Sequence, residues 1–194
     1  MARSLGKGFT LLELMVTLAI IGILAAISVP NFLKLQARSK QSEAKTNLRA
    51  LFQFEQAFLL EHSVYTTAVA RLAFAPERGN RYQYSLSVSQ NTDNRTGTTA
   101  STSTTADTIM IDTFKYGSAA TVGIPATAIC SFPSVTPGPV GASFTAVAQG
   151  NIDDDATIDV WSVSNLTRDM NNCGSKPGNI AGGEPANELD DVDN

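Results

Sequence analysis

From Phe9 to Val29 the chain is almost wholly apolar, and this run limits what the protein can fold into. As an α-helix at about 1.5 Å per residue it would be about 30 Å long, which is the thickness of the hydrocarbon core of a bilayer. Its one ionisable side chain is Glu13. A carboxylate in hydrocarbon costs at least about 2.5 kcal/mol, so Glu13 needs a partner. The run therefore predicts a membrane-spanning helix that carries a functional acid.

Residues 1–8, which precede this run, are basic through Arg3 and Lys7. A short basic start is typical of the first region of an export signal. An ordinary signal peptide would have a small-residue cleavage site between its apolar run and a polar mature start, and this chain has none there. Hydropathy alone leaves two interpretations open, a signal peptide and a plain membrane anchor.

Composition narrows the function classes. A chain of 194 residues predicts one domain, here with an extended element attached. The net charge is −4, and the basic residues cluster only in the leader and the first helix, which argues against a dedicated nucleic-acid binder. His62 is the one histidine, and the sequence holds no catalytic triad, phosphate loop or zinc spacing, so no enzyme is predicted. Cys130 and Cys173 are expected to form a disulfide if the chain leaves the cytoplasm.

After Pro30 the helical pattern continues to about Glu61 and becomes amphipathic. Apolar side chains recur at helical spacing, which predicts a stripe that packs on a globular head. The polar remainder is largely basic, and it is expected to be solvated or to contact anionic lipid or acidic neighbouring heads. The apolar stripe comprises Ala44, Leu48, Leu51, Phe52 and Phe58, and the basic side chains are Lys34, Arg38, Lys40, Lys45 and Arg49.

The remainder of the chain, residues 62–194, predicts a β-sheet head and therefore an α+β protein. Alternating apolar residues indicate strands at 81–88 and 108–116, and a hairpin formed by 143–149 and 157–163. The Thr- and Ser-rich stretch 90–108 and the Pro- and Gly-rich stretch 131–141 are expected to be loops. The acidic tail, 184–194, holds almost nothing apolar and is expected to be a mobile, solvent-facing end.

The loop inside the predicted hairpin is the one constellation that resembles a binding site. Its polar residues alternate in the order that a calcium loop uses for its ligands. Two parts of that motif are missing, because Ala156 stands where the turn glycine belongs and Ser162 where the bidentate glutamate belongs. The sequence favours a polar hairpin tip, and calcium is the alternative. The candidate ligands are Asn151, Asp153, Asp155 and Asp159, with Thr157 between the last two.

The stretch Lys7-Gly8-Phe9-Thr-Leu-Leu-Glu13 resembles the cleavage motif of type IV prepilins and related pseudopilins. The resemblance implies that a membrane prepilin peptidase cuts between Gly8 and Phe9 and N-methylates Phe9. It also implies that Glu13 pairs with the terminal ammonium of a neighbouring subunit. Gly22 and Pro30 match family positions between which the helix loosens in the filament, and both residues weaken a helix on physical grounds.

Two further stretches, 36–47 and 74–82, resemble the major pilins of the myxobacterial type. The implied architecture is the pilin fold: a leader at 1–8, a long helix at 9–61 and a head at 62–194. The first part of the helix, 9–29, would lie in the membrane and later in the filament core. The resemblance also implies that Cys130 and Cys173 close the C-terminal disulfide loop of many pilins.

The family resemblance predicts a structural subunit of a type IV pilus that serves surface motility and adhesion. The expected partners are copies of the same chain, the prepilin peptidase, the pilus assembly machinery of the inner membrane and the membrane itself before assembly. The precursor would reside in the inner membrane and the assembled subunit at the cell surface, with no cofactor unless calcium binds. Two alternatives remain open: a type II secretion pseudopilin, and a minor pilin that acts as a surface binding module.

Overall fold

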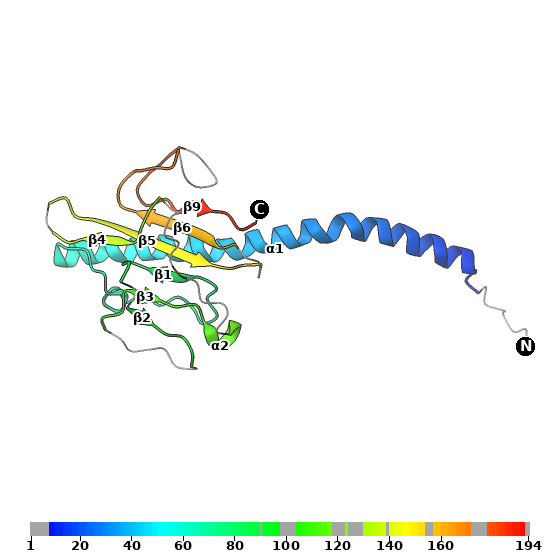
Figure 1. Ribbon diagram of the computed structural model, residues 1–194, viewed down its shortest axis with the longest axis horizontal. Coiled ribbons are helices and arrows are strands. Elements are labelled where there is room, and N and C mark those ends of the chain that lie inside the picture. Colours follow the sequence, from blue (N-terminus) through cyan, green and yellow to red (C-terminus); the bar gives the residue numbers. More distant parts are fainter. Residues whose placement is uncertain are drawn as a thin grey trace, which may run out of the picture. The chain divides into compact units, whose positions relative to one another are not determined.

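The computed structural model describes residues 8–89, 91–97, 104–117, 123, 130–138, 140–153, 157–171 and 178–192. The chain divides into two compact units, Met1–Ala37 and Arg38–Asn194. Helix α1, Leu11–His62, contributes its first part to the first unit and its second part to the other (Figure 1). The predicted long helix is therefore confirmed.

The described part of the first unit consists mainly of one apolar helix. Every described residue from 8 to 36 is exposed, and Pro30 lies inside the helix. By length and composition α1 is the one helix of the described chain that could cross a membrane, with a mean hydropathy of 2.4 over its most apolar window. None of that window is buried. A helix that is apolar on all sides and unburied needs lipid or other helices around it.

The second unit packs the rest of α1 against a sheet. The strand order is β2-β3-β1-β5-β6-β9, with β4 added beside β5 and a separate ribbon formed by β7 and β8. All pairings are antiparallel except that of β2 with β3. The elements are η1 Val69–Leu72, β1 Gln83–Ser85, β2 Thr92–Asp93, β3 Thr108–Ile109, α2 Thr113–Tyr116, β4 Ser134–Thr136, β5 Ser143–Gly150, β6 Asp159–Ser164, β7 Arg168–Asp169, β8 Asn179–Ile180 and β9 Ala186–Leu189.

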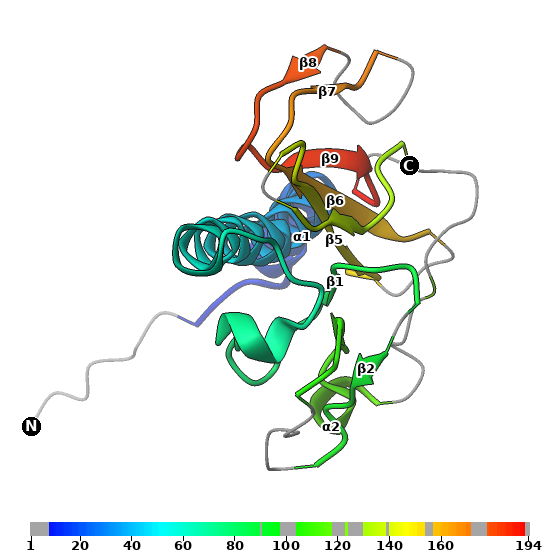
Figure 2. The same ribbon diagram turned by 90° about the vertical axis from the view of Figure 1, so that its left-hand side faces the viewer.

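One face of this sheet meets α1, as Figure 2 shows with the helix seen end-on beside β5 and β6. The ring of Phe144 lies 5.7 Å from that of Phe52 on the helix and 4.9 Å from that of Tyr65, measured between ring centroids. The predicted stripe of α1 is buried here, with Ala44, Leu48 and Leu51 fully covered. The predicted hairpin of β5 and β6 and the α+β class are thus confirmed.

The opposite face of the sheet is buried as well. Because successive side chains of a strand alternate between faces, the residues between the helix-facing ones point away from α1. Val147 and Val160 form an apolar cluster there. Gln83 and Gln149 are also buried on this side, and their amide atoms have no hydrogen-bond partner. A strand buried on both faces explains why β6 is buried along its whole length.

The described part of the acidic tail, residues 184–192, is ordered in the sheet and its flanks, which corrects the prediction of a mobile, solvent-facing end at 184–194 as far as residue 192. Ala186–Leu189 forms β9, the last strand of the sheet, and pairs with β6. Glu188 and Asp191 are 2% and 1% exposed. Their carboxylates accept hydrogen bonds from the chain itself, so these two acidic residues are structural partners rather than solvating groups.

Three other predictions were wrong in part. The stretch 90–108 contains β2, and the stretch 131–141 contains β4. The strand predicted at 108–116 ends at Ile109, and α2 follows because the side chain of Asp112 caps it by accepting from the backbone N–H of Lys115. Buried Arg95 explains the order near β2, since its guanidinium donates to the backbone oxygen of Pro76 at 2.8 Å.

Candidate functional site

The predicted cleavage point lies immediately before α1. Gly8 and Phe9 are exposed, Phe9 by 80%, and the helix begins two residues later at Leu11. A side chain at position 8 would meet no other atom within 4 Å. The peptide bond between Gly8 and Phe9 is therefore accessible in a segment outside the helix. Cleavage there and methylation of Phe9 remain predictions.

Glu13 forms a capping box with Thr10 at the start of α1. Its Oε2 atom accepts from the backbone N–H of Thr10 at 2.9 Å and from the Thr10 hydroxyl at 2.7 Å. The Glu13 N–H donates in turn to Thr10 Oγ1 at 3.2 Å. This reciprocal pattern satisfies two backbone donors that the first helical turn leaves unpaired. A threonine three residues before a glutamate is its sequence signature, which the sequence analysis missed.

The capping box sits in an apolar surface. Large apolar side chains from Phe9 to Leu35 are 52–80% exposed, and they lie on every side of the helix. Gly22 and Pro30 lie within this stretch, and a side chain at position 22 would meet no atom within 4 Å. The predicted loosening of the helix between them remains a prediction. What the geometry supplies is a long contact surface with one acid at its end.

A second acid, Asp159, anchors α1 to the sheet. Its Oδ2 accepts from the Tyr82 hydroxyl and from Trp161 Nε1, both at 2.5 Å. Its Oδ1 accepts from Gln41 Nε2 at 3.0 Å and from Asn187 Nδ2 at 3.1 Å. Donors from α1, β6, β9 and the residue before β1 thus meet on one fully buried carboxylate. Burial raises its pKa, although the four hydrogen bonds act in the opposite direction.

The candidate calcium ligands have different surroundings in the structure. Asp159 has donors on both oxygens, whereas Asp153 is exposed and Asp155 lies outside the described residues. Asp191 fixes the loop instead, since it accepts from the backbone N–H of Ile152 at 3.2 Å and from the Thr157 hydroxyl. Among the described residues no group of three or more His, Cys, Asp or Glu side chains is placed to hold a metal. Calcium binding by this loop, with Asn151 as a further candidate, remains a prediction.

The cysteine region is tied to the tail. Cys130 is disulfide-bonded, while its predicted partner Cys173 lies outside the described residues. Glu188 Oε2 accepts from the backbone N–H groups of Cys130 and Ser131 at 2.7 and 2.9 Å. The tail strand β9 therefore fixes this segment through a buried carboxylate as well as taking part in the sheet.

Two family models match this chain. One, described as type IV pilin PilA, matches residues 35–159, and the other, described as the prokaryotic N-terminal methylation motif, matches residues 3–29. The second match contains Gly8, Phe9 and Glu13, the residues that surround the predicted cleavage point and the capping box.

Curated relatives agree with these matches. The chain is 39% identical over 206 residues to the type IV major pilin protein PilA of Myxococcus xanthus, covering 96% of this chain and 92% of the relative. It is 36% identical to the type IV wide pilus major component PilA4 of Thermus thermophilus, over 34% of this chain and 50% of the relative. A type II secretion system core protein G of Vibrio cholerae is 45% identical over 31% of this chain and 41% of its own length.

Proposed function

The chain belongs to the type IV pilin PilA family, and from this premise we propose that it polymerises through α1 into a pilus filament as its major structural subunit. The observation that carries the proposal is the apolar surface of the first unit, which is exposed on all sides in the single chain. Each apolar side chain removed from water contributes about 1.5–3 kcal/mol. Burial of these side chains therefore favours a bundle of such helices once the subunits leave the bilayer.

Processing precedes assembly in this scheme. The precursor resides in the inner membrane with the apolar part of α1 in the bilayer. A prepilin peptidase removes residues 1–8, and Phe9 becomes the methylated N-terminus. The accessible segment before α1 supports this order, because a peptidase can reach a bond that lies outside the helix. The pilus assembly machinery then transfers the subunits into a filament at the cell surface.

Glu13 acts in this scheme as the assembly acid. Among the described residues its carboxylate is held by Thr10 alone, through short hydrogen bonds at an exposed position. The cleaved Phe9 ammonium of a neighbouring subunit is a stronger partner, since an ion pair away from water is worth more than hydrogen bonds to neutral groups. Exchange of the first partner for the second would set the position of one subunit along the next.

A type II secretion pseudopilin is the second candidate, because the chain is also similar to core protein G. That similarity covers 31% of this chain, whereas similarity to the M. xanthus major pilin covers 96%. The longer match favours the pilus. Surface motility and adhesion are the processes that we propose for it, and a minor pilin with a binding role remains distinguishable by its low abundance in filaments.

Mass spectrometry of filaments sheared from the cell surface tests the proposal. The expected result is that this chain is the main component and begins at methylated Phe9. A mature chain that retains residues 1–8, or filaments in which this chain is a trace component, would contradict it. A periplasmic location with no surface filaments would favour the pseudopilin.

A further inference from the structure

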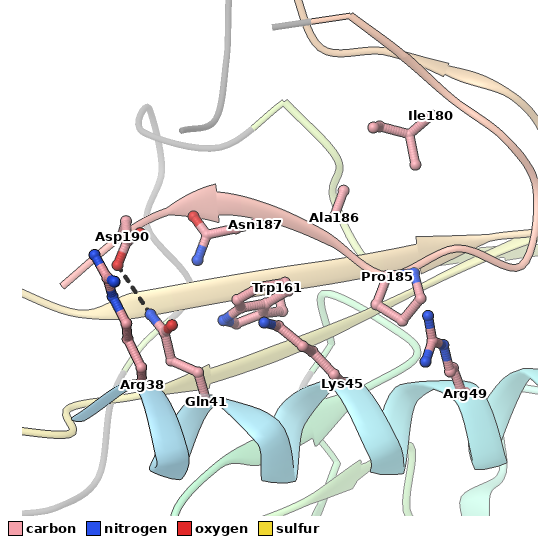
Figure 3. Close-up of a pocket in the computed structure, with 10 residues that line it drawn as sticks. All are labelled: Arg38, Gln41, Lys45, Arg49, Trp161, Ile180, Pro185, Ala186, Asn187 and Asp190. Atoms are coloured by element: carbon pink, nitrogen blue, oxygen red, sulfur yellow. Dashed lines mark hydrogen bonds between the residues drawn. The ribbon is translucent and has the colours of Figure 1, made fainter. Parts of the chain in front are cut away.

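In the second unit α1 has a hollow on each of its two flanks. On one flank a groove of about 580 Å³ lies between α1 and β9, and Arg38, Lys45 and Arg49 line it from the helix (Figure 3). On the other flank a pocket of about 470 Å³ lies between α1 and the turn 77–80, and Glu43 is among the helical residues that line it. Glu43 and Lys45 are two residues apart, so their side chains leave the helix about 160° apart. The groove and this turn pocket therefore lie at the same level of α1 on opposite flanks.

The groove holds a cation without an acidic partner, Lys45. Its ammonium lies 4.5 Å from the centroid of the Trp161 ring, and among the described residues it forms no ion pair. Arg49 pairs with Glu184 at 3.0 Å, but both side chains are 60% exposed, so this surface pair exchanges readily. Asp190 lies at the other end of the groove (Figure 3). Because an aromatic ring carries no net charge, the groove stays positive around Lys45.

The turn on the other flank presents an acid without a basic partner, Glu77. Its side chain is exposed, and among the described residues its carboxylate forms no ion pair. The backbone of the turn is fixed, since Asp112 accepts from the Gly79 N–H at 2.7 Å and pairs with Arg78 at 3.0 Å. Gly79 has a φ of +87°, which a glycine adopts without strain. The turn therefore holds an unpaired acid in a defined position.

We propose that these two flanks bind each other between neighbouring copies of the chain, with Glu77 of one copy in the groove of the next, on Lys45 and Arg49. The inference rests on the proposed function, because a filament needs contacts that propagate. A contact between two different surfaces of a subunit propagates into an open filament, whereas a contact of one surface with its own copy closes a dimer. Opposite charges on opposite flanks supply such a propagating contact for the second unit.

Glu77 fits this contact better than three other exposed acids of the second unit. Glu61, at the end of α1, lies about 18 Å along the helix axis beyond the last cation of the groove. Asp169 belongs to β7, which pairs with β8, and Ile180 of β8 lines the groove, so this acid is on the groove's own flank. Asp153 follows a residue that is held within its own chain through both backbone groups.

The row of cations accepts an acid over a range of positions. From Arg38 to Arg49 it extends over about 16 Å of the helix axis, so a smaller axial offset between two copies leaves Glu77 beside one of the cations. A phospholipid headgroup or an anionic polysaccharide would also meet these cations. Neither would depend on Glu77, and the tests therefore use this residue to separate the occupants.

Carbodiimide cross-linking of sheared filaments tests the contact, because this reagent joins an amine directly to a carboxylate beside it. The expected product links Lys45 to Glu77 and is identified by mass spectrometry of proteolytic peptides. It must join two copies, since the two residues lie on opposite flanks within one chain. The full chain dispersed in detergent is the control and should lack the link. Filaments in which Lys45 is linked to another acid, such as Asp169, or to none would overturn the inference.

Charge reversal tests what the contact contributes to assembly. Glu77→Lys is expected to reduce the yield of sheared filaments roughly tenfold, because it places like charges together. Glu61→Lys is the matched control, since it reverses an exposed acid away from both flanks, and its yield should be normal. Lys45→Glu should also reduce the yield, and the double change Lys45→Glu with Glu77→Lys should restore it. Lys45→Arg keeps the cation and removes the amine, so it should form filaments without the cross-link.

These results separate the inference from the proposed function. Normal filament yield from the Glu77→Lys chain, as expected if the groove binds lipid or polysaccharide, would overturn the flank contact while the pilus assignment stands. Failure of the double change to restore the yield would also overturn it. Absence of filaments from the unmodified chain would overturn the pilus assignment and the inference with it.

Discussion

The two units of this chain treat a carboxylate in opposite ways. In the first unit Glu13 is exposed and held by a single neighbouring residue, Thr10. In the second unit Asp159 is fully buried and accepts from four residues in four separate segments of the chain. The first arrangement is easily exchanged for another partner, whereas the second is not. The comparison indicates that the second unit satisfies this buried acid within the chain, whereas the first unit leaves its acid for another molecule.

The apolar surfaces follow the same division. Side chains of residues 8–36 are unburied on all sides of α1, while Ala44, Leu48 and Leu51 of the stripe that follows are fully covered by the sheet. One continuous helix therefore has a half that folds against its own chain and a half that does not. Substitutions in the two halves should accordingly fail in different assays, and the predictions below are ordered from the largest expected effect to the smallest.

Replacing Glu13 should have the largest effect, and it should appear only in assembly. Glu13→Leu removes the acid that we propose to pair with the neighbouring ammonium, so filaments are expected to disappear. Removal of residues 1–8 should continue, because Glu13 is not at the cleaved bond. The melting temperature of the second unit should not change, because Glu13 belongs to the first unit. Filament yield, the mass of the mature chain and circular dichroism measure the three properties. Glu61→Leu is the control, since Glu61 is an exposed acid at the other end of α1. Normal filaments from the Glu13 variant would contradict the assignment of Glu13 to assembly.

Replacing Asp159 should have the largest effect on stability. Asp159→Ala removes the acceptor of Tyr82, Trp161 and Asn187, while Gln41 keeps Asp190, so we expect the free energy of unfolding to fall by about 3–5 kcal/mol. Denaturant unfolding of the full chain in detergent measures it. Asp169→Ala is the matched control, because Asp169 is exposed and accepts one local hydrogen bond, and it should change stability by less than about 0.5 kcal/mol. Similar losses from both variants would show that the four hydrogen bonds are not what anchors α1.

Glu55 predicts a pH dependence of the second unit. It is fully buried on α1, its Oε1 has no hydrogen-bond partner, and burial raises its pKa to about 8. Between its ordinary pKa and this value the unfolded chain releases a proton that the folded chain retains. Stability therefore falls as pH rises through that window, by about 3 kcal/mol between pH 4.5 and 7.

Glu55→Gln removes this titration, so its unfolding free energy should lack that downward slope between pH 5 and 8. The exposed Glu61→Gln serves as the control and should keep the slope of the unmodified chain. The measurement is denaturant unfolding at several pH values. A slope that persists in the Glu55→Gln chain would assign the pH dependence to another group.

Local patterns predicted much of this fold. The apolar run and the stripe after Pro30 predicted α1, and strict alternation predicted β5 and β6, because these elements bury residues at the period of their own geometry. The prepilin-like motif around Gly8 and Glu13 likewise lies in one short segment, which a family model matches. Features that depend on neighbouring residues along the chain could therefore be predicted from the sequence.

Features that depend on distant residues were not. The acidic composition of the tail predicts a mobile end, yet Glu188 is buried. Its carboxylate accepts from the backbone N–H groups of Cys130 and Ser131, which are far away in the sequence. Asp159 was considered as a calcium ligand, but the donors that surround it come from residues between positions 41 and 187. Short strands such as β2 and β9 lack a periodic pattern, and only their partners in the sheet define them.

The smallest expected effect tests the capping box that makes Glu13 exchangeable. Thr10→Val removes the hydroxyl that accepts from the Glu13 N–H at 3.2 Å and donates to the Glu13 carboxylate. Loss of an N-cap costs about 1 kcal/mol, so the amide hydrogens of the first turn should exchange roughly fivefold faster in detergent micelles. Thr10→Ser retains a hydroxyl and should exchange like the unmodified chain. Slow exchange in the valine variant would mean that the carboxylate alone holds the helix start, and Glu13 would then be less free to change partners than the comparison with Asp159 implies.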